Sequence, residues 1–197
     1  MCIFIFWYRV FPSRYSRLTM DGMLLVSPEL QSEGLRELGS DAIFTISSAK
    51  PGNGVEQLRD GNLETFWQSD GQAPHLINIQ FIRKTSVSKL CFFVDYALDE
   101  SYTAKKIAIR SGHTQHDLAD VAAIELLEPS GWCHVTIRDP ENADQPLRSH
   151  LIQLRIQSMH QNGRDTHVRQ IKVFGPRRDE PVQAFKSVSM LQYSVLR

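Results

Sequence analysis

The chain has 197 residues, 42% of them hydrophobic, which is enough to bury one sizeable core and favours a single domain with appendages. Its 22 Lys and Arg residues balance 22 Asp and Glu residues, so no net charge draws the protein to nucleic acid or to an anionic membrane. The three cysteines show no C-x-x-C spacing, which argues against a disulfide framework or a zinc knuckle and favours a reducing compartment.

The chain begins with an apolar extension, residues 1–23. Its most apolar part, residues 2–8, is far shorter than the roughly 20 residues that a membrane span needs. No basic segment of the kind that opens a secretory signal precedes it. Our hypothesis is that about the first 19 residues are dispensable or reflect the choice of start site, with Met20 or Met23 as the alternative initiators.

The domain that follows is expected to cover residues 24–176. In residues 24–38 the apolar side chains are irregularly spaced and Pro28 and Gly34 intervene, which predicts short helical turns instead of one helix. Residues 55–62 predict another turn of helix, because they end in the turn-forming sequence Asp-Gly-Asn.

Eight short segments of this domain predict β-strands, because in most of them apolar and polar residues alternate. These segments are residues 42–47, 77–82, 90–94, 107–110, 121–127, 133–138, 152–157 and 170–174. Gly, Pro, Asp and Asn separate them. The pattern predicts an all-β fold, an antiparallel β-sandwich or jelly roll.

Residues 160–167 form a polar loop between two predicted strands, and residues 69–75 form a second one. Asn162-Gly163 predicts a turn in which a positive φ is tolerated. A turn does not need the other polar side chains of residues 160–167, so we interpret this loop as a recognition surface held by the strands. The alternative is an ordinary solvated loop.

Catalytic and metal-binding patterns are absent. The sequence has no nucleophile elbow, glycine-rich phosphate loop or H-E-x-x-H motif. Cys133 and His134 are adjacent in a predicted strand, so their side chains point to opposite faces and cannot act together. His113, His116 and Asp117 have the right donor types for a metal, but no further ligand lies near them in the sequence. We therefore expect no enzyme activity, no cofactor and no metal.

Residues 177–197 form the last segment. Gly and Pro residues close the domain at 175–181, and the apolar residues beyond them are too few to form a core. We expect this tail to dock on the domain or on a partner.

Several motifs in one order resemble a known family. They lie in residues 48–71, 74–81, 99–103, 128–132 and 160–172. Together they are similar to the Doc-domain family of subunits of the anaphase-promoting complex, over residues 34–176 and again at the last two residues. The resemblance implies a galactose-binding-domain-like jelly roll that is not itself an enzyme. It implies a substrate co-receptor of this cullin-RING ubiquitin ligase, which binds the destruction-box degron together with a propeller-type coactivator, raises processivity in cell-cycle control, and resides in the nucleus and cytoplasm.

The resemblance also implies the site residues and partners. By position, the ligand-binding loops of the family fall on Ser69, Asp70, Gly71, Gln72, His75, His160, Gln161, Asn162, Gly163, Arg164, Asp165, Thr166 and His167. The C-terminal Ile-Arg of the family, which docks into a tetratricopeptide subunit, falls on Leu196 and Arg197, where Leu replaces Ile. The implied partners are this subunit, the cullin scaffold, the coactivator and destruction-box substrates.

A carbohydrate-binding module is the alternative from another class. Residues 60–62 with residues 65–67 also resemble discoidin-type and carbohydrate-binding jelly rolls. Those modules usually work outside cells, whereas the unpaired cysteines favour a reducing compartment.

Overall fold

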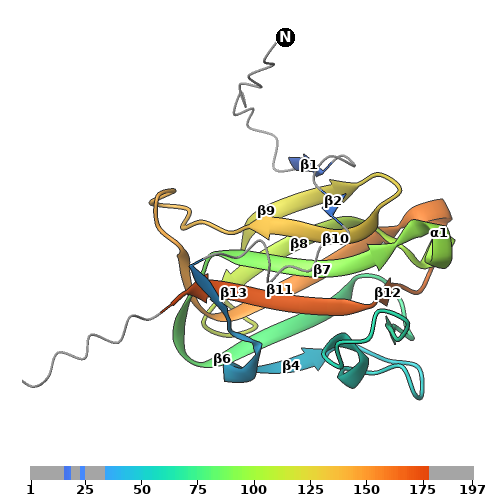
Figure 1. Ribbon diagram of the computed structural model, residues 1–197, viewed down its shortest axis with the longest axis horizontal. Helices are drawn as coiled ribbons and strands as arrows, with labels where there is room; N and C mark the ends of the chain where they lie inside the picture. Colours follow the sequence, from blue (N-terminus) through green and yellow to red (C-terminus); the bar gives the residue numbers. More distant parts are fainter. Residues whose placement is uncertain (1–15, 19–22, 25–33, 178–197) are drawn as a thin grey trace, which may run out of the picture.

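The computed structural model describes residues 16–18, 23–24 and 34–177, the first two segments by their backbone alone. Two mostly antiparallel sheets form a β-sandwich (Figure 1). In spatial order, the six-stranded sheet contains β1 (Ser16–Leu18), β9 (Ala119–Leu126), β8 (Ala104–Gly112), β11 (Leu147–Met159), β6 (His75–Val87) and β4 (Ala42–Ile46). The five-stranded sheet contains β2 (Met23–Leu24), β10 (Ser130–Thr136), β7 (Lys89–Asp95), β13 (Gln170–Pro176) and β3 (Leu35–Glu37). The predicted sandwich and its eight strand segments are confirmed.

One main hydrophobic core lies between the sheets. Ile77 and Ile79 of β6 and Phe92 and Val94 of β7 all belong to it and are at most 1% exposed. Their spacing of two residues reflects the alternation of a strand, which sends every second side chain to the same face. The apolar run of β7 is continuous because Cys91 and Phe93, on its other face, belong to a second, smaller cluster.

The structure corrects the expected helical turns of residues 24–38 in the part that it describes. Leu35–Glu37 is strand β3, which pairs with the end of β13. The pairing satisfies the backbone groups of three residues whose side chains show no regular spacing, so the sequence pattern could not indicate it. Only the short 3₁₀ turn Gly39–Asp41 follows, whereas the predicted turn in residues 55–62 is confirmed as the 3₁₀ turn Glu56–Leu58.

Two short strands, one helix and two turns gather at one end of the sandwich. They are β5 (Trp67–Gln68) with its partner β12 (His167–Val168), helix α1 (Tyr96–Asp99), and the 3₁₀ turns η5 (Glu100–Tyr102) and η6 (His160–Asn162). Strand β13 ends at the opposite end of the molecule, and β11 runs from that end to η6 (Figure 1). Within the described residues, every helix is too short to cross a membrane.

Candidate functional site

The two polar loops predicted from the sequence lie side by side. Beyond the paired strands β5 and β12, the Ser69 N–H donates to the Thr166 carbonyl at 3.1 Å, and the Thr166 N–H donates to Ser69 Oγ at 2.9 Å. His75 Nε2 lies 2.7 Å from the Arg164 carbonyl oxygen. Residues 69–75 and 160–167 therefore form one continuous surface, which we call the mouth. Both loops therefore lie at the same end of the sandwich.

Part of the mouth points inward, and the interpretation of residues 160–167 as uniformly displayed is wrong. His160 and His167 are buried, and Thr166 is fully buried, with its Oγ1 donating to the Tyr102 carbonyl at 3.2 Å. Ser69 and His75 are buried as well. His160, Thr166 and His167 are enclosed because residues 96–102 contact them, although the two segments are about sixty residues apart in the chain.

The displayed part of the mouth is smaller than predicted. The exposed residues are Asp70, Gly71, Gln72, Ala73, Pro74, Gln161, Asn162 and Arg164. Asp165 is half-buried and forms an ion pair with Lys50 at 3.1 Å, a residue that the sequence did not indicate. A carboxylate that is already paired has less to offer a ligand, so Asp70 is the exposed acid of the mouth.

The turn within residues 160–163 differs from the one predicted. Gln161 and Asn162 have φ values of 50° and 57°, so Asn162 takes the positive φ as expected. Gly163 has φ of −56°, and its small size matters for another reason. A Cβ at Gly163 would clash with the Ser101 backbone carbonyl. The glycine thus permits a close approach between this turn and η5.

A buried ionic network lies beneath the mouth, and sequence analysis missed it. Asp99 is 5% exposed and accepts hydrogen bonds from His167 Nδ1 at 3.0 Å and from the Arg169 guanidinium, Nε at 3.1 Å and Nη2 at 2.8 Å. Burial by itself raises the pKa of Asp99, but the hydrogen bonds from His167 and Arg169 outweigh it, so the pKa lies below its ordinary value. Asp99 therefore carries its charge inside the protein.

The His167 ring lies between two aromatic rings. Its centroid is 4.2 Å from that of Phe66 and 4.3 Å from that of Tyr102, and both pairs are stacked. Arg169 lies over Phe66, 5.5 Å from the ring centroid. Asp99 and Tyr102 lie in one of the motifs that carry the family resemblance, but no sequence spacing indicates that they contact His167.

The Cys133 thiol is poorly suited to acid–base chemistry. Burial raises the pKa of its thiol far above the ordinary value, and Cys91 adds to the shift. His134 instead lies 3.3 Å from the sulfur of Cys91 on the neighbouring strand, which confirms that Cys133 and His134 face different ways. Among the described residues, Cys91 and Cys133 form no disulfide.

The sequence His113-x-x-His116-Asp117 forms a turn. The Asp117 carboxylate accepts hydrogen bonds from the backbone N–H groups of His113 at 3.1 Å and Thr114 at 2.6 Å. Among the residues that the structure describes, no three His, Cys, Asp or Glu side chains converge as metal ligands would.

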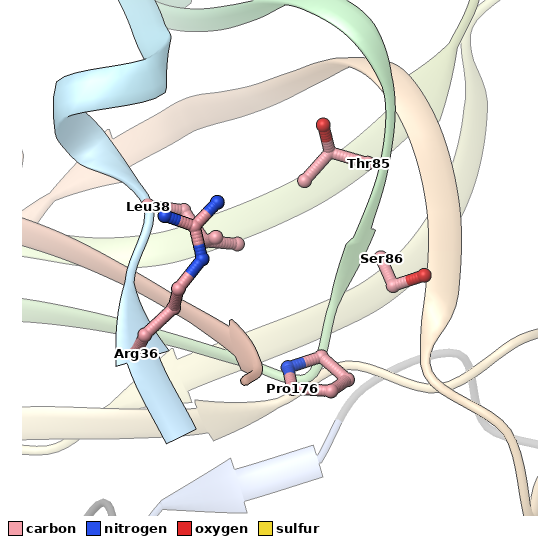
Figure 2. A pocket seen from close by; sticks show the side chains of 5 residues that line it. All are labelled: Arg36, Leu38, Thr85, Ser86 and Pro176. Carbon is pink, nitrogen blue, oxygen red and sulfur yellow. The ribbon is translucent and has the colours of Figure 1, made fainter. Parts of the chain in front are cut away.

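A small pocket of about 70 Å³ lies at the opposite end of the sandwich (Figure 2). It is lined by Arg36, Leu38, Thr85, Ser86 and Pro176, which come from β3, β6 and the end of β13. Arg36 already forms an ion pair with Asp41. The pocket is far from the mouth, where the exposed polar groups gather.

Comparison with known proteins gives consistent matches. The family described as "Anaphase-promoting complex, subunit 10 (APC10)" matches residues 19–195. Anaphase-promoting complex subunit 10 of Homo sapiens and that of Mus musculus are each 50% identical over 163 residues, covering 83% of this chain and 87% of theirs. Anaphase-promoting complex subunit DOC1 of Saccharomyces cerevisiae is 34% identical over 142 residues, which cover 72% of this chain and 56% of the yeast protein.

Solved structures share the fold. The family 32 CBM of C. perfringens NanJ, in complex with galactose, gives a TM-score of 0.59 at 14% identity and covers 71% of this chain and 98% of that one. The CBM32-1 and CBM32-2 domains of Clostridium perfringens ZmpB, in complex with GalNAc, give 0.64 at 11% identity, covering 86% and 42%. This likeness confirms the predicted galactose-binding-like jelly roll and shows the fold alone.

Proposed function

The chain belongs to the anaphase-promoting complex subunit 10 family, and on this basis we propose that it is a non-catalytic substrate co-receptor of that ubiquitin ligase. In this proposal the mouth binds the destruction-box degron together with a propeller-type coactivator and so raises the processivity of ubiquitination during cell division. The protein would work in the nucleus and cytoplasm.

The observation that carries the proposal is the joining of residues 69–75 and 160–167 into one surface. The surface exposes opposite charges on Asp70 and Arg164 and amide groups on Gln72, Gln161 and Asn162. Amides and charges of this kind can hydrogen-bond an extended peptide and pair with its charged side chains.

The same surface is suited to shared binding. The free energy gained from a few exposed polar contacts barely exceeds the free-energy cost of ordering a peptide. The mouth should therefore bind a degron weakly on its own. A coactivator that holds the same substrate raises its effective concentration at the mouth, and the combined affinity then exceeds either one alone. A weak second receptor that prolongs residence is what a processivity factor requires.

The tail supplies the proposed attachment. Leu196 and Arg197, the predicted docking residues for a tetratricopeptide subunit, lie outside the described residues. Their chemistry supports the proposal, since an apolar side chain, a guanidinium and the α-carboxylate can all be bound in one groove. The cullin scaffold is a further proposed partner within the assembled complex.

We predict that replacing Asp70 and Arg164 together with Ala shortens the ubiquitin chains added per binding event by the reconstituted ligase. Both side chains are exposed, so each change should alter the free energy of unfolding by within ~0.5 kcal/mol. The matched control replaces Glu141 and Arg83, another exposed acid and base, which lie outside the mouth.

Chain lengths on a destruction-box substrate measure the outcome. Native chain lengths for the Asp70 and Arg164 variant would contradict the proposal, as would an equal loss in the control. A glycan array tests the carbohydrate-binding alternative, since specific capture of a sugar by the mouth would favour it.

A further inference from the structure

Three segments that are distant in sequence meet around one buried carboxylate. They are residues 60–66, residues 96–102 and residues 160–169, which include one loop of the mouth. We propose that Asp99 is the positioning residue of the mouth, because it fixes His167 and Arg169 and thereby ties the other two segments to the recognition surface. This inference rests on the proposed function of the mouth and assigns Asp99 no direct contact with a ligand.

Asp99 binds two side chains through both of its oxygens. Arg169 donates from Nε at 3.1 Å to Oδ2 and from Nη2 at 2.8 Å to Oδ1, and His167 Nδ1 lies 3.0 Å from Oδ1. A two-point guanidinium–carboxylate pair fixes the orientation of both planes as well as their distance. The three groups are all less than a tenth exposed, so water does not compete for these bonds.

Arg169 extends the network to residues 60–66. Its Nη1 donates to the Leu63 carbonyl at 2.8 Å, and its guanidinium lies over the Phe66 ring. A segment of irregular backbone is thus held by one side chain that is itself oriented by Asp99. Without the carboxylate, the buried guanidinium would lose its counter-charge, and a buried charge without a partner is strongly unfavourable.

His167 extends the network to the mouth itself. Phe66 and Tyr102 hold the two faces of its ring, and Asp99 holds its Nδ1 edge. The preceding residue, Thr166, makes the two hydrogen bonds to Ser69 that join the loops. The orientation of His167 therefore sets the position of the backbone that carries Arg164 and Asn162.

Preorganisation is the consequence for binding. When the loops are already held in place, little of their conformational entropy is lost on binding a peptide. Loops that had to become ordered on binding would lower the affinity. The residues of the network pack beneath the exposed side chains and limit their movement. A binding site needs such packing to hold its contact residues in a fixed geometry.

The test uses the Asp99→Asn variant of the full chain, assembled in the reconstituted ligase with its coactivator and measured for binding of a labelled destruction-box peptide. Asn has the shape of Asp without its charge. We expect affinity to fall about tenfold, equivalent to ordering one or two further side chains on binding. The matched control is Glu37→Gln, which removes the carboxylate partner of Arg59, a pair of 2.8 Å that contacts no residue of the mouth. It should keep native affinity.

A second variant separates positioning from stability. Asp99→Asn combined with Arg169→Met removes the unpaired buried cation, so the thermal midpoint should return toward that of the native chain. Affinity should stay low, because His167 still lacks its carboxylate partner and Arg169→Met also removes the donor to the Leu63 carbonyl. Native affinity in Asp99→Asn, or affinity that returns together with stability in the double variant, overturns the inference.

Two further measurements keep the test decisive. If Asp99→Asn does not fold, Tyr102→Ala removes one face of the His167 stack at a residue that is 38% exposed, and it should lower affinity in the same way. Native affinity there overturns the inference. The Asp70 and Arg164 variant is measured in parallel: if it too binds natively, the proposed function fails, whereas a loss in that variant alone refutes only the role of Asp99.

Discussion

The pKa of the His160 imidazole is changed by its position in the fold. Burial lowers the pKa of its imidazole and Lys105 lowers it further, while Glu128 and the backbone of Leu126 oppose part of the shift. The folded chain therefore takes up this proton at a lower pH than the unfolded chain does. Between the two pKa values the unfolded state binds more protons, so stability falls as the pH falls through that window.

We predict that the native chain loses stability on acidification from pH 7.5 to pH 5, and that His160→Gln loses less, since unfolded His titrates near pH ~6.5. Urea midpoints at the two pH values measure the difference. His116→Gln, which removes an exposed imidazole, is the control and should behave as the native chain does. An equal pH response in native and His160→Gln chains would contradict the account.

The sequence could predict where the site lies but not which of its side chains face outward. Residues 160–167 and 69–75 are polar and bounded by turn-formers, which local patterns reveal. The inward rotation of His160 and His167 depends on Tyr96 and Tyr102, which pack on their rings. Contacts between residues so distant in the chain leave no periodic pattern in the sequence. From the sequence alone, a buried polar residue in a loop therefore cannot be told from an exposed one.

At the scale of elements, the turns η5 and η6 lie very close together. Gly163, directly after η6, is the point of closest approach, and only a residue without a side chain fits there. The Cβ that Ala would add at Gly163 meets the carbonyl of Ser101, which is part of the backbone and cannot rotate away as a side chain could. The mouth is thus held from this side by steric contact as well as by hydrogen bonds.

We predict that Gly163→Ala lowers the free energy of unfolding by about 1–3 kcal/mol, the usual range for an overpacked site. Gly54→Ala is the matched control, because the nearest atom to its added Cβ is Gln57 Oε1 at 3.9 Å. That change should alter stability by within ~0.5 kcal/mol. Denaturant unfolding of both variants is the measurement, and equal stabilities would show that the turn moves freely.

Alternation of residues predicted the strands but not their lengths. β6 and β11 each run for 13 residues, well beyond the predicted segments 77–82 and 152–157. Residues 82–84 of β6 are exposed in succession, which breaks the alternation, although Thr85 and Val87 beyond them are buried again. The pairing of β6 with β11 shifts register between Gln80 and Thr85, and such an irregularity leaves no period-two pattern in the sequence.

At the scale of the whole molecule, the mouth and the C-terminal end of β13 lie at opposite ends of the sandwich. The mouth lies beside α1 and β12, whereas β13 ends at Pro176 at the other end (Figure 1). Sites this far apart, with no shared contacts, usually contribute independently.

We predict that deleting Leu196 and Arg197 weakens binding to the isolated tetratricopeptide subunit at least about tenfold, since even one lost charge-assisted hydrogen bond is worth about 1.5–3 kcal/mol. The thermal midpoint should not change. Leu196→Ile, which restores the residue of the family, is the control and should change binding by less than ~1.5 kcal/mol. Undiminished binding of the shortened chain would exclude the tail as the attachment.

Strand β11 sets, by its length, the distance between the two ends of the sandwich. It runs for 13 residues from the end where β13 stops to the turn η6 at the mouth. At the rise of an extended strand this is roughly 40 Å. A flexible linker of the same length would average roughly 20 Å between its ends and vary widely. The sandwich therefore holds the mouth at a set distance from the end of β13.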